Sequence, residues 1–306
     1  MNPAWSVIFF TVLAGAGQGL FLMVLRAQAA GASAASLVGT CATSLTLLAV
    51  GLACSFFHLG HPLRAWRAVA MWRTSWLSRE VIVLPLLIAA IAAWTFMAAT
   101  GNGASPALDV VAIVLCFALW VCTGMIYACL RFLREWAHPL TVLNFTLIGW
   151  MSGATLFVAG WGGSAGTRAG ATALDAAIVL TALAAIGRIA SLLRNRALKP
   201  VSTPQSALGI ANAKLRQMSR GTTAGSFNTR EFFHGRSAAA VANVKWLALV
   251  LAFALPLALL VGARQTGSQE LAVLAVAAQF AGLLAERWLF FAQANHPQNI
   301  YYQAVA

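Results

Sequence analysis

Titratable side chains are concentrated in one short stretch of the chain, FFHLGHPLRAWRAVAMWRTSWLSRE, which runs from Phe56 to Glu80. The stretch holds two histidines, four arginines, three tryptophans and a glutamate, although only 9% of the whole chain is charged. Histidine titrates near neutral pH, and partial desolvation raises the pKa of a glutamate toward the same range. His58, His61 and Glu80 therefore have the chemistry of a proton-exchange site.

The aromatic and basic residues of the same stretch indicate a partner for this proton exchange. A histidine and a glutamate can pass protons to and from the oxygens of a quinone, while Trp66, Trp72 and Trp76 contact its ring and its isoprenoid tail. Arg64 and Arg79 complete the candidate quinone-binding set. The plainer explanation for each tryptophan is the aromatic belt that membrane proteins carry at the lipid–water interface.

Glu80 and the histidines also have purely structural explanations. Glu80 follows SWLSR, where Ser75 or Ser78 can cap a helix and a carboxylate in the first turn complements the helix dipole. Three His-Pro pairs recur in the chain, and an amphipathic residue beside a helix stop accounts for at least two of them. These pairs begin at His61, His138 and His296.

The composition shows what kind of element must position these residues. The 306-residue chain is 60% hydrophobic and has seven acidic residues in total, and its mean hydropathy is +0.80. Soluble domains carry about a quarter of their residues as charged side chains. The sequence therefore predicts an integral membrane protein. Its first apolar run, which begins at Trp5, is expected to be a retained helix and no signal peptide, because it has no basic region before it.

Eight apolar segments are long enough to cross the hydrocarbon core, which takes roughly 20 residues. We expect one all-α bundle of eight transmembrane helices, residues 1–306, with no separate soluble domain. The segments lie near 5–25, 36–57, 81–99, 107–130, 139–160, 171–193, 240–262 and 270–292.

The basic residues predict how the bundle is oriented. Eight spans place both termini on one side of the membrane, and seventeen of the 20 lysines and arginines fall on that side. The opposite side holds only Arg26, Arg168 and Arg264. Because cytoplasmic loops carry the excess of basic residues, we expect both termini and the basic loops in the cytoplasm of a bacterium. All five histidines fall on the same side.

The connection between the sixth and seventh spans, residues 194–239, is long and strongly basic. It carries eight basic residues against the single acid Glu231, and its segment GSFNTREFFHGR contains three phenylalanines. A long connection of this kind is either functional or a mobile basic linker. The phenylalanines favour a surface that docks a partner subunit. The candidate docking residues are Arg216, Arg220, Arg230, Phe232, Phe233 and His234.

Several other functions fit the sequence poorly. The five cysteines lie in or beside apolar runs and form no CxxC, so any iron–sulfur cluster is expected on another chain. Bis-histidine haem needs imidazoles from facing helices at membrane depth, whereas every histidine here lies near a helix end. Zinc needs more ligands than the HxxH of His58 and His61 supplies. The net charge of +13 is mostly a topology signal and does not indicate nucleic acid binding.

Four segments resemble a known family. FHLGHPLRAW, SWLSRE, SFNTREFFHG and the terminal ERWLFFAQANHPQNIYYQ are similar to the membrane anchor subunits of the dimethyl sulfoxide reductase family. The resemblance extends from the second span to the C-terminus. GSFNTREFFHGR and HPQNIYYQ are at least as close to anchors of the related complexes that oxidise sulfite in the cytoplasm.

This resemblance implies a function in electron transport. Such an anchor has eight spans and neither haem nor metal. It exchanges electrons between menaquinone or ubiquinone and a four-cluster, ferredoxin-like iron–sulfur subunit, which connects it to a molybdopterin catalytic subunit. The family's quinone-site histidine matches His58, and its acidic partner matches Glu80. His61 departs from forms of the motif with a small polar residue at that position. Terminal reductases of the family oxidise quinol, whereas sulfite-oxidising complexes reduce quinone.

Two other functions remain as alternatives. A secondary transporter would place polar groups near the bilayer midplane, for which the spans offer Gln18, Asp175, Arg188 and Gln279. Gln18 lies between Gly15 and Gly19, whose spacing also suits a helix-packing contact. A purely structural membrane tether is the second alternative, and it would leave the histidine–glutamate pair without a function.

Overall fold

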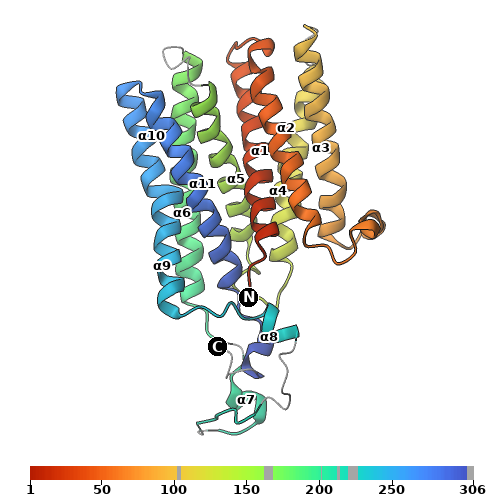
Figure 1. The fold of residues 1–306 in the computed structure, drawn as a ribbon, viewed down its shortest axis with the longest axis vertical. Helices are drawn as coiled ribbons and strands as arrows, with labels where there is room; N and C mark the ends of the chain where they lie inside the picture. The colour runs from red at the N-terminus through yellow and green to blue at the C-terminus, as the bar shows by residue number, and fades with distance from the viewer. Residues whose placement is uncertain (102–104, 162–167, 201, 212–213, 220–226, 302–306) are drawn as a thin grey trace.

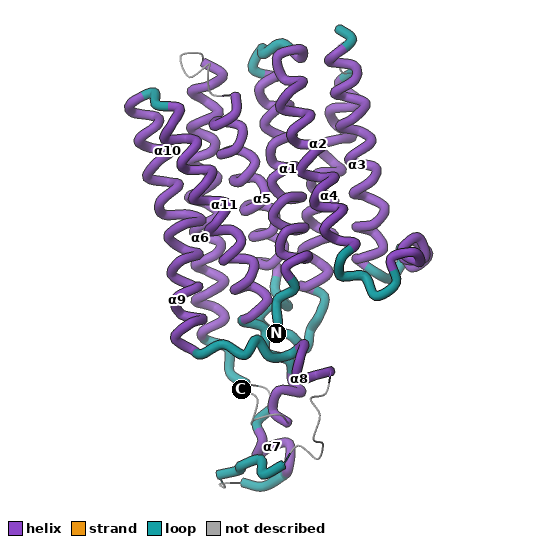
Figure 2. Tube along the Cα trace, viewed as in Figure 1, coloured by secondary structure: helices purple, strands orange, loops and turns teal. Residues whose placement is uncertain are grey.

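Eight helices that are long and apolar enough to cross a membrane run side by side in the computed structural model of the chain (Figures 1 and 2). The structure describes residues 1–101, 105–161, 168–200, 202–211, 214–219 and 227–301, and within these ranges every regular element is helical. The eight spans predicted from the apolar segments are therefore confirmed. They are α1 (Trp5–Ala29), α2 (Ala34–Phe56), α3 (Trp76–Ala99), α4 (Pro106–Ala128), α5 (Pro139–Trp161), α6 (Arg168–Arg196), the combined α9 (Ala238–Leu249), η3 (Val250–Ala254) and α10 (Leu255–Thr266), and α11 (Gln269–Ala292).

Serine residues fix where several of these helices begin. The side chain of Ser75 accepts a hydrogen bond from the backbone N–H of Ser78, which caps α3. α2, α4, α9 and α11 begin after serines that do the same. A side-chain acceptor at this position satisfies one of the free N–H groups of the first turn. Because Ser75 is the cap, α3 starts at Trp76, and the predicted start at residue 81 is too late.

Two helices form the centre of the bundle. In the most apolar 18-residue window of each span, the buried share of residues is 78% in α1 and 61% in α5. It is 28% to 44% in the other six spans. The two cross with their backbones in contact, since a Cβ atom on Gly19 would clash with the carbonyl oxygen of Gly149. A Cβ atom on Gly153 would clash with the backbone nitrogen of Leu20. The packing function expected for the glycines around Gln18 is confirmed.

Both termini lie at the same end of the bundle (Figure 1). The same end carries the connection from α6 to α9, with its short helices α7 (Pro204–Leu208) and α8 (Phe227–Glu231). We call this end the basic face. A 3₁₀ helix, η1 (Pro62–Met71), links α2 to α3 there and projects sideways beyond α3, as the orange segment of Figure 1 shows.

Two of the arginines assigned to the basic face by charge counting lie inside the bundle. Arg188 of α6 and Arg287 of α11 are each only 3% exposed. Both form ion pairs with Glu286, which is 1% exposed. These two arginines are therefore held between helices by a buried carboxylate, which the charge count did not anticipate.

Candidate functional site

Glu80 lies in the second turn of α3 and is buried against α4. Its side chain is 5% exposed, and its Oε1 accepts a hydrogen bond from the hydroxyl of Thr123. Since α3 begins at Trp76 and carries no acidic residue in its first turn, the helix-capping explanation of Glu80 does not hold. A carboxylate buried at the end of a membrane helix is costly and commonly has a function.

His58 and His61 lie outside the helices. α2 ends at Phe56, so the two histidines fall in the turn that follows, and Pro62 begins η1 directly after His61. Both are exposed in the single chain. Partial desolvation lowers the pKa of His58 from its ordinary value of 6.5, which keeps its imidazole neutral at neutral pH. Because the helix stops before them, the three-residue spacing of the two histidines does not place them on one helical face.

The segment between α2 and α3, residues 57–75, is an amphipathic arm on the outside of the bundle. None of the residues of η1 is buried. Phe57 is 84% exposed, Leu63 93% and Trp66 71%. Arg64 is exposed among them, and the guanidinium of Arg67 lies 5.4 Å from the ring centre of Trp66. Apolar and cationic side chains mixed in this way suit a lipid–water interface or a bound amphipathic ligand.

Arg79 holds the arm to α3. Its Nε donates to the carbonyl oxygen of Trp72 at 2.9 Å, and its Nη2 donates to that of Arg73 at 2.8 Å. Its guanidinium also lies 4.2 Å from the ring centre of Trp76. Trp76 and Glu80 are four residues apart on α3 and therefore lie on one face of the helix. Arg79 thus positions the arm beside the face that carries Glu80.

No hydrogen bond or ion pair joins His58 to Glu80 within the described part of the chain. α2 and α3 are packed neighbours, so the two side chains belong to adjacent elements at one end of the bundle.

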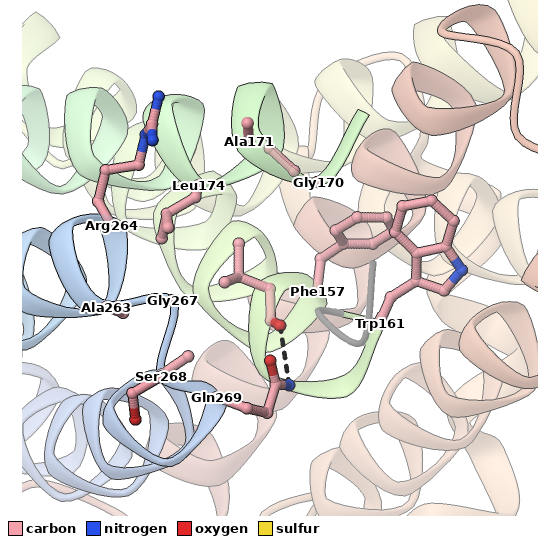
Figure 3. Close-up of a pocket in the computed structure, with 13 residues that line it drawn as sticks. Phe157, Trp161, Gly170, Ala171, Leu174, Ala263, Arg264, Gly267, Ser268 and Gln269 are labelled. Atoms are coloured by element: carbon pink, nitrogen blue, oxygen red, sulfur yellow. Dashed lines mark hydrogen bonds between the residues drawn. The ribbon is translucent and has the colours of Figure 1, made fainter. Parts of the chain in front are cut away.

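A separate cavity lies at the opposite end of the bundle, between α5, α6, α10 and α11 (Figure 3). It is lined by apolar side chains that include Phe157, Trp161 and Leu174. At the edge of the cavity, Nε2 of Gln269 donates a hydrogen bond to the carbonyl oxygen of Val158 at 3.2 Å (Figure 3). This cavity contains neither a carboxylate nor a histidine among its described lining residues, so it offers no proton-exchanging group there.

The end of the basic connection packs against both termini. The backbone N–H of Asn2 donates to the carbonyl oxygen of Glu231 at 2.8 Å. The side-chain amide of Asn2 donates to the backbone carbonyl oxygen of Arg230 at 3.2 Å. Phe232 stacks on His296, with ring centres 3.9 Å apart. His234 lies 6.0 Å from the ring of Trp288 and accepts a hydrogen bond from its own loop. These contacts define a clasp formed by residues 1–2, 230–234 and 295–299.

The candidate docking residues divide between the clasp and the rest of the connection. Arg230, Phe232, Phe233 and His234 belong to the clasp, and both phenylalanines are half-buried. Arg216 is exposed elsewhere in the connection, and Arg220 lies outside the described residues. The structure therefore brings together four of the six predicted residues, on the same face of the bundle as the arm.

Sequence reasoning missed the residue that contacts Glu80. Thr123 lies in the middle of the apolar run VCTGMIY, where a threonine carries no special signal. It also missed the pairing of Arg188 with Glu286, since these residues are far apart in the chain. Among the described residues no group of three or more His, Cys, Asp or Glu side chains is placed to hold a metal ion.

The family is decided by a match that spans most of the chain. The family model of the DMSO reductase anchor subunit (DmsC) matches residues 1–293. The chain belongs to this anchor subunit family. It is also 46% identical, over 327 aligned positions that cover all of both chains, to a subunit of the sulfite dehydrogenase from Allochromatium vinosum. The resemblance of the sequence motifs to this family is confirmed, and the protein is the membrane anchor subunit of a molybdoenzyme complex.

Proposed function

We propose that this anchor subunit exchanges electrons and protons between the membrane quinone pool and an iron–sulfur subunit. That subunit, expected to be ferredoxin-like with four clusters, connects it to a molybdopterin catalytic subunit. The observation that carries the proposal is Glu80, a carboxylate buried near the start of α3, whose neighbour Arg79 binds the exposed arm that holds His58. Membership in a family of quinone-reactive anchors supports it.

Each residue of the site has a distinct part in this function. A bound quinone supplies the two-electron, two-proton redox chemistry. Glu80 holds or releases a proton inside the bundle, and the hydroxyl of Thr123 fixes the orientation of its carboxylate. His58, which is exposed, exchanges protons with water at the basic face. Trp66 and Trp76 contact the ring and the tail of the quinone.

The remaining candidates support the binding site from outside. Arg64 and His61 lie exposed on or beside η1, where they can contact the polar edge of a quinone. Arg79 donates two hydrogen bonds to the backbone of the arm, so its contribution is to hold the arm in place. His61→Ala in the same assays tests whether His61 carries a proton.

We also infer the direction of electron flow and the location of the partner. The full-length relative belongs to a sulfite dehydrogenase, which favours electron transfer from the catalytic subunit to quinone in this protein as well. The basic face then lies in the cytoplasm, because it carries most of the basic residues. The iron–sulfur subunit docks there, near the clasp and on the same face as the arm.

Substitution of the two proton carriers tests the site. Glu80→Gln keeps the size and the hydrogen-bonding capacity of the side chain but removes the exchangeable proton, and His58→Ala removes the imidazole. In membranes that contain the whole complex, we expect each change to lower quinone-linked turnover by about 100-fold or more. Electron transfer from the catalytic subunit to a soluble acceptor should continue at the wild-type rate. Equal loss of both activities would refute a quinone-site function and indicate an assembly defect.

A second experiment tests the docking surface. Phe232 and Phe233 are half-buried apolar side chains among basic residues, the combination that forms the energetic centre of an interface. The double change Phe232→Ser and Phe233→Ser should release the soluble subunits from washed membranes. Leu208→Ser is the matched control, because Leu208 is 61% exposed in the same connection but lies in α7, outside the clasp. Retention of the subunits by the double variant would mean that the connection is a basic linker.

A further inference from the structure

The arm, residues 57–75, sorts its side chains by type along its helix. In a 3₁₀ helix, side chains three residues apart lie above one another, so η1 presents three rows. Leu63, Trp66 and Val69 form one row, and all three are exposed. The backbone N–H of Trp72 donates to the carbonyl oxygen of Val69, so the turn continues and the exposed Trp72 extends this row. The arm therefore carries a continuous row of large apolar side chains.

A basic row lies next to the apolar row. Arg64, Arg67 and Arg73 are spaced by multiples of three residues, and all three are exposed. The guanidinium of Arg67 lies 5.4 Å from the ring centre of Trp66, and that of Arg73 lies 5.6 Å from the ring centre of Trp72. The same Trp–Arg pair thus occurs twice, six residues apart, which is about 12 Å along a 3₁₀ helix.

The third row of the arm is the one turned toward the bundle. Its two middle residues, Ala65 and Ala68, are partly covered, whereas Pro62 and Met71 at its ends are exposed. η1 packs against α3, and Arg79 of α3 binds the backbone at the end of the arm. Small side chains on this row allow the close approach. The apolar and basic rows are therefore left to the surroundings of the bundle.

No carboxylate of the described chain pairs with the arginines of the arm. The arm itself contains neither aspartate nor glutamate. Among the described residues, no ion pair involves Arg64, Arg67 or Arg73. A basic row without acidic partners, next to an apolar row, is typical of a segment that lies on a membrane surface containing anionic lipids.

The position of the arm agrees with a membrane surface. It projects sideways beyond α3 at the end of the bundle, whereas the clasp lies beneath the bundle together with α8 (Figure 1). The spans on both sides of the arm are also poorly covered by protein. In their most apolar 18-residue windows, the buried share of residues is 28% in α2 and 33% in α3, so this side of the bundle faces lipid. The arm therefore extends over the surrounding bilayer.

We propose that the arm is a binding site for anionic phospholipids of the adjoining membrane leaflet. The apolar row lies among the acyl chains near the headgroups, and the basic row binds the phosphate groups. Arginine suits this task because its guanidinium can form two parallel hydrogen bonds to a phosphate while it stacks on an aromatic ring. Each Trp–Arg pair supplies one such unit. This lipid binding does not depend on quinone chemistry, so either proposal can fail without the other.

Hydrogen exchange of the intact complex in lipid nanodiscs tests the proposal. Because η1 buries none of its residues in the protein, its amides should exchange rapidly in nanodiscs of phosphatidylcholine, which has no net charge. In phosphatidylglycerol nanodiscs, peptides within residues 57–75 should exchange up to about 100-fold more slowly, since each of the three arginines contributes about fivefold in affinity for an anionic surface. Equal exchange of these peptides in the two lipids would overturn the proposal.

Paired substitutions assign the effect to the basic row. Arg67→Gln combined with Arg73→Gln leaves one arginine on the arm, so the slowing should fall to about fivefold. Neither residue belongs to the proposed quinone site. Arg131→Gln combined with Lys214→Gln is the matched control, because it removes the same charge from exposed positions of the basic face outside the arm. The control should respond to phosphatidylglycerol as the wild type does, and a wild-type response in the arm variant would contradict the site.

A docked protein subunit would give a different result. The full chain without its soluble subunits should show the same dependence on phosphatidylglycerol as the intact complex. Protection of residues 57–75 that appears only when the soluble subunits are present, in either lipid, would overturn the proposal and assign the arm to the iron–sulfur subunit.

Discussion

Two buried carboxylates at the basic-face end of the bundle are held in opposite ways. Glu286 is fixed between the guanidinium groups of Arg188 and Arg287, whereas Glu80 accepts a hydrogen bond from the neutral hydroxyl of Thr123. Arginines stay charged, so each of them forms an ion pair with the carboxylate beside it. A hydroxyl can hydrogen-bond to either form of a carboxyl group. Glu286 is therefore fixed by two ion pairs, whereas Glu80 is held by a contact that does not depend on its charge.

The surroundings of the two carboxylates also differ. The cluster of Glu286 is enclosed by α5, α6 and α11. The guanidinium of Arg287 in this cluster lies 4.3 Å from the ring centre of Phe145. Glu80 adjoins an arm whose apolar and basic side chains are exposed. We propose that the enclosed group has a structural function and that Glu80, close to an exposed arm, serves a diffusing ligand.

The largest effect is expected from removing the ion pairs of Glu286. Glu286→Gln leaves Arg188 and Arg287 as buried cations without a counter-charge, which destabilises a protein by about 3–5 kcal/mol. We expect little or no assembled complex in membranes, measured by immunoblotting of all subunits. Glu80→Gln removes no ion pair, so that variant should assemble at the wild-type level. Normal assembly of Glu286→Gln would contradict the structural function of the cluster.

The next effect is a change in pH dependence that isolates His58. Desolvation lowers the pKa of this imidazole below its ordinary value of 6.5, so it loses its proton as the pH rises through a value below 6.5. When the complex reduces quinone, His58 must deliver a proton, and quinone-linked turnover should therefore fall as the pH rises through that value. His58→Gln should remove this inflection from the pH–rate profile. The soluble-acceptor assay serves as the reference, and persistence of the inflection in His58→Gln would assign it to another group.

The smallest effect is expected from removing the hydroxyl of Thr123, which donates a hydrogen bond to Glu80. Thr123→Val keeps the shape of the side chain but removes the hydrogen bond to Glu80, which is worth about 1 kcal/mol. Quinone-linked turnover should fall about fivefold, with unchanged assembly. Thr95→Val is the control, because the hydroxyl of Thr95 donates to the backbone of its own helix at Ile91, away from Glu80. Equal effects of the two substitutions would mean that the hydrogen bond to Glu80 has no functional part.

Much of the fold follows from local sequence signals. The apolar runs predicted all eight spans because a membrane helix needs about 20 such residues wherever it packs. Ser75 marked the start of α3, although the apolar run alone placed that start five residues late, at 81. Gly15 and Gly19 indicated a close helix contact, which the structure shows against Gly149.

The site could be predicted only in part, because its decisive contacts join distant segments. The sequence of the arm directed attention to His58 and Glu80, since their residue types are rare in this chain. It contained no signal for Thr123, which becomes meaningful only because α4 packs against α3. The pairing of Arg188 with Glu286 was missed for the same reason, since a linear pattern does not reveal a partner on α11.

The location of the quinone is the most direct test of the comparison between Glu80 and Glu286. A photoactivatable quinone analogue would be bound to the intact complex, cross-linked by light, and mapped by mass spectrometry. We expect labelled peptides within residues 57–80 and around Thr123, with labelling suppressed by excess natural quinone and reduced in Glu80→Gln. Labelling at the opposite end, on the cavity lined by Phe157, Trp161 and Leu174 (Figure 3), would contradict the assignment of quinone chemistry to Glu80 and His58.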